Sequence, residues 1–250
     1  QANDLTVQAE IDLAKFNTQL ARFIDLGPIH FAGQLLCDAK LTTAPRRLDF
    51  QIDLAGTDLF LRGLTPHDLR EPQIELNLQG SLTQAQDNHV AAVTIERGQL
   101  LADKIQLQFS GQINPKPLAL TGQLQLKTDL SRVNTYLAQF IDLGQVRFAG
   151  QLLCQADITT QDRQLNFQAD LTADDLVISG LASPDLHEPH LQLTLDGSLT
   201  RTENNQIAAL SFKQAQLLTD RTQLQFSGQI DPKPLAVTGR AQITADLARL

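Results

Sequence analysis

Polar and apolar residues alternate along most of the chain. From Ile29 to Leu41 the odd positions are apolar or small, and the even positions include the polar residues Gln34, Asp38 and Lys40. A period of two is typical of a β-strand that turns one face to a core and the other to water. We therefore predict a mainly β protein built from amphipathic antiparallel strands. The same alternation recurs in residues 5–13, 48–54, 74–82, 104–113 and 118–126.

A short stretch before each series of strands follows a helical pattern instead. Asp12 is a good N-cap residue, and Gly27 is a typical helix end. Between them the apolar residues recur every three or four positions, which predicts an amphipathic helix. A second copy of the pattern runs from Asp129 to Gly144. The spaced apolar residues of the first copy are Leu13, Phe16, Leu20, Phe23 and Ile24.

The chain contains a long internal repeat with an offset of 117 residues. Sliding residues 12–130 onto 129–247 gives 66 identities in 119 positions without a gap. Such a period marks an array of similar modules. Since the chain lacks Met and a new copy begins at Asp246, we expect a segment of a longer array. The predicted divisions are repeats at 12–128 and 129–245, the end of a preceding repeat at 1–11, and the start of a following repeat at 246–250.

Each repeat is then expected to hold one helix and roughly eight strands. A sheet with one apolar face must cover that face, and a 12-residue helix about 18 Å long shields only roughly a fifth of it. Two architectures meet this requirement. The sheet closes around a dry core of its own side chains, or it forms a trough whose floor is covered by an apolar ligand.

Mid-strand glycines on the apolar face favour strong curvature in both architectures, because such glycines mark bulges and bends. They are Gly33, Gly80, Gly111 and Gly122, which recur as Gly150, Gly197, Gly228 and Gly239. Aromatic residues make up only 5% of the chain, fewer than a dry sandwich of this size normally uses to fill its centre. We therefore predict an extended U-shaped groove.

The inner face of that groove should carry the ligand-binding residues. We predict a lipid-binding lining taken from the apolar positions of the strands at 29–41 and 104–113 and of their copies. Its members are Ile29, Phe31, Leu35, Cys37, Leu107, Phe109, Ile113, Val146, Phe148, Leu152, Cys154, Leu224, Phe226 and Ile230.

Charge and motifs narrow the function further. A net charge of −8 argues against nucleic acid as a partner, since such binders need a basic face. The sequence has no nucleophile elbow, phosphate loop or Cys-x-x-Cys motif. We expect no enzymatic activity and no cofactor.

The remaining titratable residues favour structural interpretations. His187 and His190 are interrupted by Pro189 and lack counterparts in the first repeat, so we interpret them as part of a solvated turn rather than a metal site. Asp174 and Asp175 are likewise predicted to lie in a solvated loop. Cys37 and Cys154 occupy equivalent positions of successive repeats, which predicts two buried thiols and no disulfide.

Two segments resemble a known group of proteins. Gly122–Leu130 and Gly239–Leu247 each form a Gly-led amphipathic strand that runs into Asp-Leu and a short helix, and Gly-Ser-Leu recurs at 80–82 and 197–199. The chain resembles the AsmA-like and TamB-like proteins of Gram-negative envelopes, which belong to the bridge-like lipid transfer proteins with repeating β-groove modules.

The resemblance implies a partner and a location. Neighbouring repeats would stack into a long trough that shields phospholipid or other acyl chains between the inner and outer membranes. The protein would lie in the periplasm, anchored in the inner membrane through a segment outside this sequence. A structural alternative stays open: the repeats could be stacked β-sandwich domains of a surface adhesin or stalk.

Overall fold

The computed structural model describes most of the chain. The described residues are 3–24, 27–63, 69–86, 89–103, 105–115, 118–137, 144–161, 163–180, 185–201, 207–232 and 235–245. They form thirteen strands in one antiparallel sheet whose strand order follows the chain order, β1 to β13, together with two short helices. The prediction of a mainly β, antiparallel fold is confirmed. The U-shaped groove goes beyond this topology and stays a prediction.

The helices and strands of the second repeat reproduce those of the first almost residue for residue at the 117-residue offset. The first set is β1 (Asn3–Asp12), α1 (Leu13–Leu20), β2 (His30–Ala44), β3 (Arg47–Arg62), β4 (Leu69–Gln84), β5 (Val90–Ala102) and β6 (Ile105–Pro115). The second set is β7 (Leu118–Asp129), α2 (Leu130–Leu137), β8 (Arg147–Gln161), β9 (Gln164–Ser179), β10 (Leu186–Arg201), β11 (Ile207–Thr219), β12 (Thr222–Pro232) and β13 (Leu235–Ala245).

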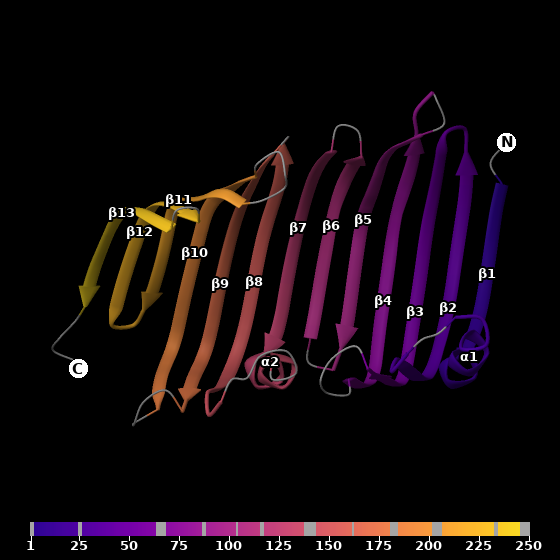
Figure 1. Cartoon of the computed structure of the whole chain (residues 1–250), viewed down its shortest axis with the longest axis horizontal. Coiled ribbons are helices and arrows are strands. Elements are labelled where there is room, and N and C mark those ends of the chain that lie inside the picture. The colour runs from indigo at the N-terminus through magenta and orange to yellow at the C-terminus, as the bar shows by residue number, and fades with distance from the viewer. Residues whose placement is uncertain are drawn as a thin grey trace. The chain divides into compact units, whose positions relative to one another are not determined.

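The chain divides into two compact units. The first comprises residues 1–110 and 132–144, and the second comprises 111–131 and 145–250. In the first unit β1 to β5 pair in sequence, and α1 lies against β2 (Figure 1). In the second unit β7 to β13 pair in the same way. The predicted repeat divisions at 12–128 and 129–245 stay a prediction.

The strands are longer and fewer than the alternation suggests. Among the described residues, six strands rather than eight fill one 117-residue period, and each has 11 to 16 residues. The predicted strand at 48–54 is only the first half of β3, and the one at 74–82 is the interior of β4. These strands continue past points where the alternation breaks, and β4 even contains Pro72.

Bulges explain why the strands continue where the alternation breaks. The pairing of β2 with β3 shifts between Ala32 and Gln34, opposite Asp58, whose φ is +50°. Before this bulge the apolar residues of β3 are even-numbered; after it Leu59 lies over Gly56 on the same face. The extra residue therefore resets the alternation and keeps one face apolar.

Bulges of this kind occur in both units. Asp175 has a φ of +51° where β8 and β9 shift register, and the pairing of β4 with β5 shifts between Gln79 and Gly80. The prediction that Asp174 and Asp175 lie in a solvated loop is wrong, because both belong to β9 at its bulge. Likewise His187 and His190 lie in β10 and not in a turn.

The helix prediction is correct at its start and wrong at its end. Asp12 caps α1 and accepts a hydrogen bond from the Lys15 backbone N–H at 3.0 Å. The helix ends at Leu20 and not at Gly27, and Phe23 beyond it is 84% exposed. In α2 the corresponding Asp129 accepts from Ser131 N at 2.9 Å. The predicted continuation of α2 through Phe140 and Ile141 lies outside the described residues.

Candidate functional site

The register of the sheet aligns apolar side chains into rows that cross the strands. In the first unit one row joins Ala9, Cys37, Leu54, Leu76 and Leu100, each paired with the next across adjacent strands. Parallel rows lie on either side of it, because successive rows are two residues apart along each strand. The neighbouring rows are Val7–Ala39–Ile52–Leu78–Gly98 and Ile11–Leu35–Gly56–Ile74–Ala102.

The second unit builds the same face over seven paired strands, two more than the first unit. Its central row contains seven residues, all apolar: Leu126, Cys154, Leu171, Leu193, Leu217, Leu224 and Ile243. The adjacent row is Leu124–Ala156–Ala169–Leu195–Ala215–Phe226–Ala241. An uninterrupted apolar strip thus runs across each unit at right angles to the strands.

Protein atoms leave this face largely uncovered. Among the apolar residues described, only Ala102, Ala173 and Leu176 are fully buried, and the central rows are half-buried at best. The described strands contact only the strands next to them in the chain, so no second sheet packs on this face in the described part of the chain. The stacked β-sandwiches of the structural alternative therefore have no counterpart among the described strands.

Helix α1 covers only one end of the face. Phe16 of α1 packs against Phe31 of β2 with ring centroids 6.1 Å apart, and no residue of α1 is buried. In the same unit α2 is held by an ion pair between Arg132 and Asp103, the residue that follows β5. Burial raises the pKa of nearby Glu71, and the charge of Asp103 raises it further.

On the apolar face, phenylalanine rings lie over glycines of adjacent strands. A Cβ built on Gly98 would lie 2.4 Å from the Phe109 ring, and one on Gly197 would lie 2.7 Å from the Phe167 ring. The rings also contact one another: Phe167 and Phe212 are 6.2 Å apart edge to face, and Phe212 and Phe226 are 5.9 Å apart. The mid-strand glycines therefore leave space for phenylalanine rings, in addition to marking bulges.

Several of the same glycines also allow close backbone approach. A Cβ on Gly80 would lie 2.1 Å from the Thr94 carbonyl oxygen, and one on Gly228 would lie 2.2 Å from that of Thr238. Gly33 and Gly150 have positive φ values of 116° and 122° at the bulges between the first two long strands of each repeat. The prediction that these glycines mark bulges is confirmed at Gly33, Gly80, Gly150 and Gly197.

The predicted lining residues are distributed along these rows. Cys37 lies in the central row of the first unit, and Cys154 shares the central row of the second with Leu224. All fourteen predicted residues are half-buried except Ile113, which is 45% exposed. Of the others, Leu35, Leu152, Phe226 and Ile230 lie in neighbouring rows, Phe31 and Phe148 lie near the starts of β2 and β8, Leu107 and Phe109 lie in β6, and Ile29 and Val146 lie just before β2 and β8.

Sequence reasoning missed much of the face. The predicted lining comes from two strands of each repeat, whereas β3, β4 and β5 contribute Leu54, Leu76 and Leu100 to the same row as Cys37. The alternation in 48–54 and 74–82 was the signal for the first two. After the bulges of β3 and β5 the alternation changes phase, and no single period identifies Leu59 or Leu100 as lining residues.

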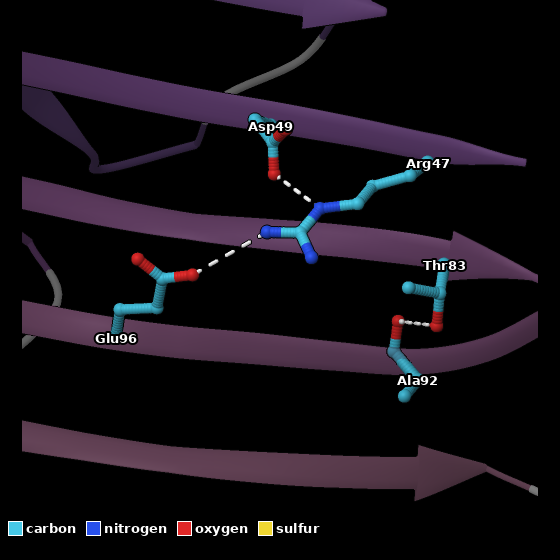
Figure 2. Close-up of polar contacts among 5 residues, drawn as sticks. All are labelled: Arg47, Asp49, Thr83, Ala92 and Glu96. Atoms are coloured by element: carbon cyan, nitrogen blue, oxygen red, sulfur yellow. Dashed lines mark hydrogen bonds and ion pairs between the residues drawn. The ribbon is translucent and has the colours of Figure 1, made fainter. Parts of the chain in front are cut away.

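The opposite face is polar, and its side chains form hydrogen bonds and ion pairs with one another over short distances along the strands. Arg47 Nε donates to Asp49 Oδ1 at 2.6 Å, and its Nη2 lies 3.5 Å from Glu96 Oε1 (Figure 2). Glu96 is one of the residues at the bulge of β5, so the bulge turns a carboxylate toward the arginine. The hydrogen bond to Asp49 raises the pKa of Arg47, and the guanidinium stays charged at every physiological pH.

Glutamine continues this pattern. The side-chain amide of Gln73 donates to Glu75 at 2.8 Å and that of Gln229 donates to Asp231 at 2.6 Å, two residues further along the same strand. These contacts are exposed and contribute little to stability individually. They make the outer face wettable without requiring any particular partner.

Other chemistry is sparse in the described residues. Neither cysteine forms a disulfide, and both are half-buried, so the prediction of two buried thiols is wrong in degree. Burial, assisted by Asp170, raises the pKa of the Cys154 thiol. His190 Nδ1 lies 2.7 Å from Asp174 Oδ1, and the described part of the chain brings together no group of three metal-ligating side chains. Within the same residues, neither helix is long and apolar enough to span a membrane.

Comparisons with models of known protein families, with curated proteins and with solved structures find no match for this chain.

Proposed function

We propose that the apolar face is the floor of a lipid-carrying groove. One observation carries the proposal: rows of apolar side chains cross all the paired strands of each unit, and protein atoms leave most of them partly open. Apolar surface of this extent requires a cover in water. The ligand class that fits best is an acyl lipid, whose chains have no polar groups to satisfy.

The rows suit hydrocarbon for a second reason. Each buried CH₂ contributes about 0.8 kcal/mol, so an acyl chain gains on the order of 10 kcal/mol over water. Equivalent rows recur every 117 residues with similar side chains. An acyl chain that moves from one repeat to the next would therefore meet a similar lining and no site that binds it much more tightly than the others. The groove would act as a passive conduit, with strands curling around the lipid into the U shape predicted from the sequence.

The resemblance to AsmA-like and TamB-like proteins supports a setting for this activity. We place the chain in the periplasm of a Gram-negative envelope, between two membranes, with an inner-membrane anchor outside this sequence. Fractionation of the native host tests the location: the protein should be released with the envelope and not with the cytoplasm.

The decisive experiment is site-specific photocrosslinking. Leu193 lies in the central row of the second unit, and Thr194 is the next residue on the opposite face. A photoreactive phenylalanine analogue replaces each residue in turn, and the protein is incubated with radiolabelled phosphatidylethanolamine vesicles. We expect labelled lipid on the Leu193 variant and at least tenfold less on the Thr194 variant.

A second measurement does not depend on substitution. Organic extraction of the purified chain followed by mass spectrometry should yield acyl lipid in stoichiometric amounts. Equal labelling at both positions, or a lipid-free extract from protein purified without detergent, would refute the conduit.

A further inference from the structure

Equivalent bulges in β5 and β11 carry charges of opposite sign. Glu96 is the extra residue of β5, where the pairing with β4 shifts after Gln79. Lys213 is the extra residue of β11, where the pairing with β10 shifts after Asp196. Glu96 and Lys213 occupy the same position of successive repeats, 117 residues apart. The two bulges therefore share their register and differ in charge.

Each of these charges has a partner of opposite sign within its own unit. In the first unit Arg47 of β3 supplies the cation, and its Nη2 lies 3.5 Å from Glu96 Oε1 (Figure 2). In the second unit Asp196 of β10 supplies the anion, and its Oδ1 lies 3.4 Å from Lys213 Nζ. The residues equivalent to these two partners in the other repeat are uncharged glutamines. The repeats therefore differ in both members of the pair.

Apart from these charges, the strands of the two repeats could exchange partners. Since neighbouring strands are antiparallel, β5 and β11 run in the same direction, and so do β4 and β10. β4 and β10 also share the run Gly-Ser-Leu-Thr beside the bulge, at 80–83 and 197–200. Similar strands are prone to alternate pairings, and tandem repeats are prone to misassembly between units. The apolar rows alone would therefore accept β11 on β4, or β5 on β10.

We infer that the reversed charges select the correct strand at this position of the sheet. Pairing β11 with β4 would put Lys213 in the place of Glu96, beside the cation Arg47. Pairing β5 with β10 would put Glu96 beside the anion Asp196. Each mispairing, within one chain or between two copies of it, replaces an attraction by a repulsion. Only the native strand order satisfies the charges of both units.

Small energies are enough for this selection. All four side chains are 40% or more exposed, and exposed ion pairs contribute little to total stability. Selection depends instead on the difference between two pairings that bury similar apolar rows. Like charges on facing strands destabilise a pairing about as much as opposite charges stabilise it. Asp49 stays beside Arg47 in either pairing and offsets part of its charge, so the mispaired strand is disfavoured severalfold.

Cysteine crosslinking detects the mispaired strand directly. Thr83 of β4 lies opposite Ala92 of β5, and Ala209 of β11 is equivalent to Ala92. Thr83→Cys and Ala209→Cys therefore face each other when β11 pairs with β4, whereas these strands are not neighbours in the native order. The starting chain combines both substitutions with Cys37→Ala and Cys154→Ala. It is refolded from urea at low salt and treated with a short bis-maleimide, and the crosslinked fraction is measured.

Reversing the charge of Lys213 should favour the mispaired strand. Lys213→Glu makes the mispaired contact with Arg47 attractive and the native contact with Asp196 repulsive, so we expect the crosslinked fraction to rise about fivefold. Adding Asp196→Lys restores the native attraction, and the fraction should then stay about twofold to threefold above that of the starting chain. The matched control, Lys127→Glu, makes the same change of charge at an exposed position of β7 and should leave the fraction unchanged.

Salt distinguishes charge selection from a general loss of stability. In about 1 M NaCl the Debye length falls to about 3 Å, so the crosslinked fractions of all variants should converge. Circular dichroism establishes that each variant folds. Equal fractions in all variants at low salt, including no crosslink in any of them, would overturn the inference. So would a rise in Lys127→Glu as large as that in Lys213→Glu, a difference that persists in high salt, or a double variant no higher than the starting chain.

Discussion

Asp58 and Asp175 adopt left-handed backbone conformations at the same bulge of successive repeats. For most residues other than glycine this conformation costs about 1–2 kcal/mol, and aspartate tolerates it better than most. In the sequence each appears only as the second of two consecutive polar residues, which also fits a loop. The bulge could not be predicted, because register shifts depend on the partner strand.

Replacing Asp58 by glycine should stabilise the fold. The substitution removes the left-handed penalty, and part of that gain is offset by the greater freedom of glycine in the unfolded chain. We expect a rise of about 0.5–1 kcal/mol in the free energy of unfolding, measured by urea denaturation. Thr57→Gly, next to it in β3, is the control and should lower stability by about 0.5–1 kcal/mol.

Cys154 should react slowly with alkylating reagents. Its pKa is raised above the usual 9.0, first by burial and second by the charge of Asp170, and only the thiolate reacts. In a Cys37→Ala variant, we expect the pH midpoint of iodoacetamide labelling to lie above 9.0 for the folded protein. The same protein in urea should return to an ordinary midpoint; coincident midpoints would contradict the burial of this thiol.

At the level of elements, the sequence predicted helix starts better than helix ends. Asp12 is a local signal, because a cap needs only its own backbone neighbours. The end of α1 depends on packing instead. Phe16 packs against Phe31, whereas Phe23 is exposed and so adds little packing that would stabilise another helical turn. Apolar spacing alone could not distinguish the two residues.

The cap of α1 should make stability depend on acid. Its hydrogen bond from the Lys15 backbone N–H lowers the pKa of Asp12 below 3.8. A lowered folded-state pKa means that the cap contributes fully above pH 3.8 and is lost as the pH falls through the folded value. The difference in urea midpoint between the native chain and Asp12→Asn should therefore shrink in acid; a difference that stays constant as the pH falls would contradict a charged cap.

Two glycines under phenylalanine rings should differ sharply in their tolerance of a methyl group. At Gly98 the three atoms nearest to an added methyl group all belong to the Phe109 ring, and in the second repeat Ala215 occupies this position while Phe226 lies over Gly228 and Gly239. Phe109 can adopt that arrangement, so Gly98→Ala should cost less than about 1 kcal/mol.

Gly80→Ala should cost about 1–3 kcal/mol by comparison. Its added methyl would meet a backbone oxygen of Thr94, which cannot rotate away as a ring can. Guanidinium denaturation of both variants measures the difference. Equal costs would show that the ring, and not the backbone, sets the limit at both positions.

For the whole molecule, the alternation of apolar and polar residues was enough to predict an antiparallel sheet with one apolar face. It could not predict which residues of different strands share a row. Cys37 meets Leu54 only because β2 and β3 are joined by a tight turn that includes Arg46 at a φ of +62°. Register is a property of strand pairs, and a single sequence displays it only indirectly.

Lipid binding should stabilise the folded chain if the groove proposal is correct. A ligand at a hundredfold its Kd adds about 2.7 kcal/mol, which for 250 residues raises Tm by roughly 5–10 °C. A short-chain phospholipid, titrated below its micellar concentration, provides the measurement by calorimetry. The shift should be lost in Leu193→Glu and retained in Thr194→Glu; an unchanged Tm in the native chain would contradict lipid binding.

The number of strands in one period has a consequence for how such a protein grows. Six antiparallel strands are an even number, so the chain leaves each 117-residue module travelling in the direction in which it arrived. Whole modules can therefore be duplicated or deleted by recombination. The strands that follow keep their direction, and their polar and apolar faces are not exchanged. A module of five strands would reverse everything after it, and gene duplication could add such modules only in pairs.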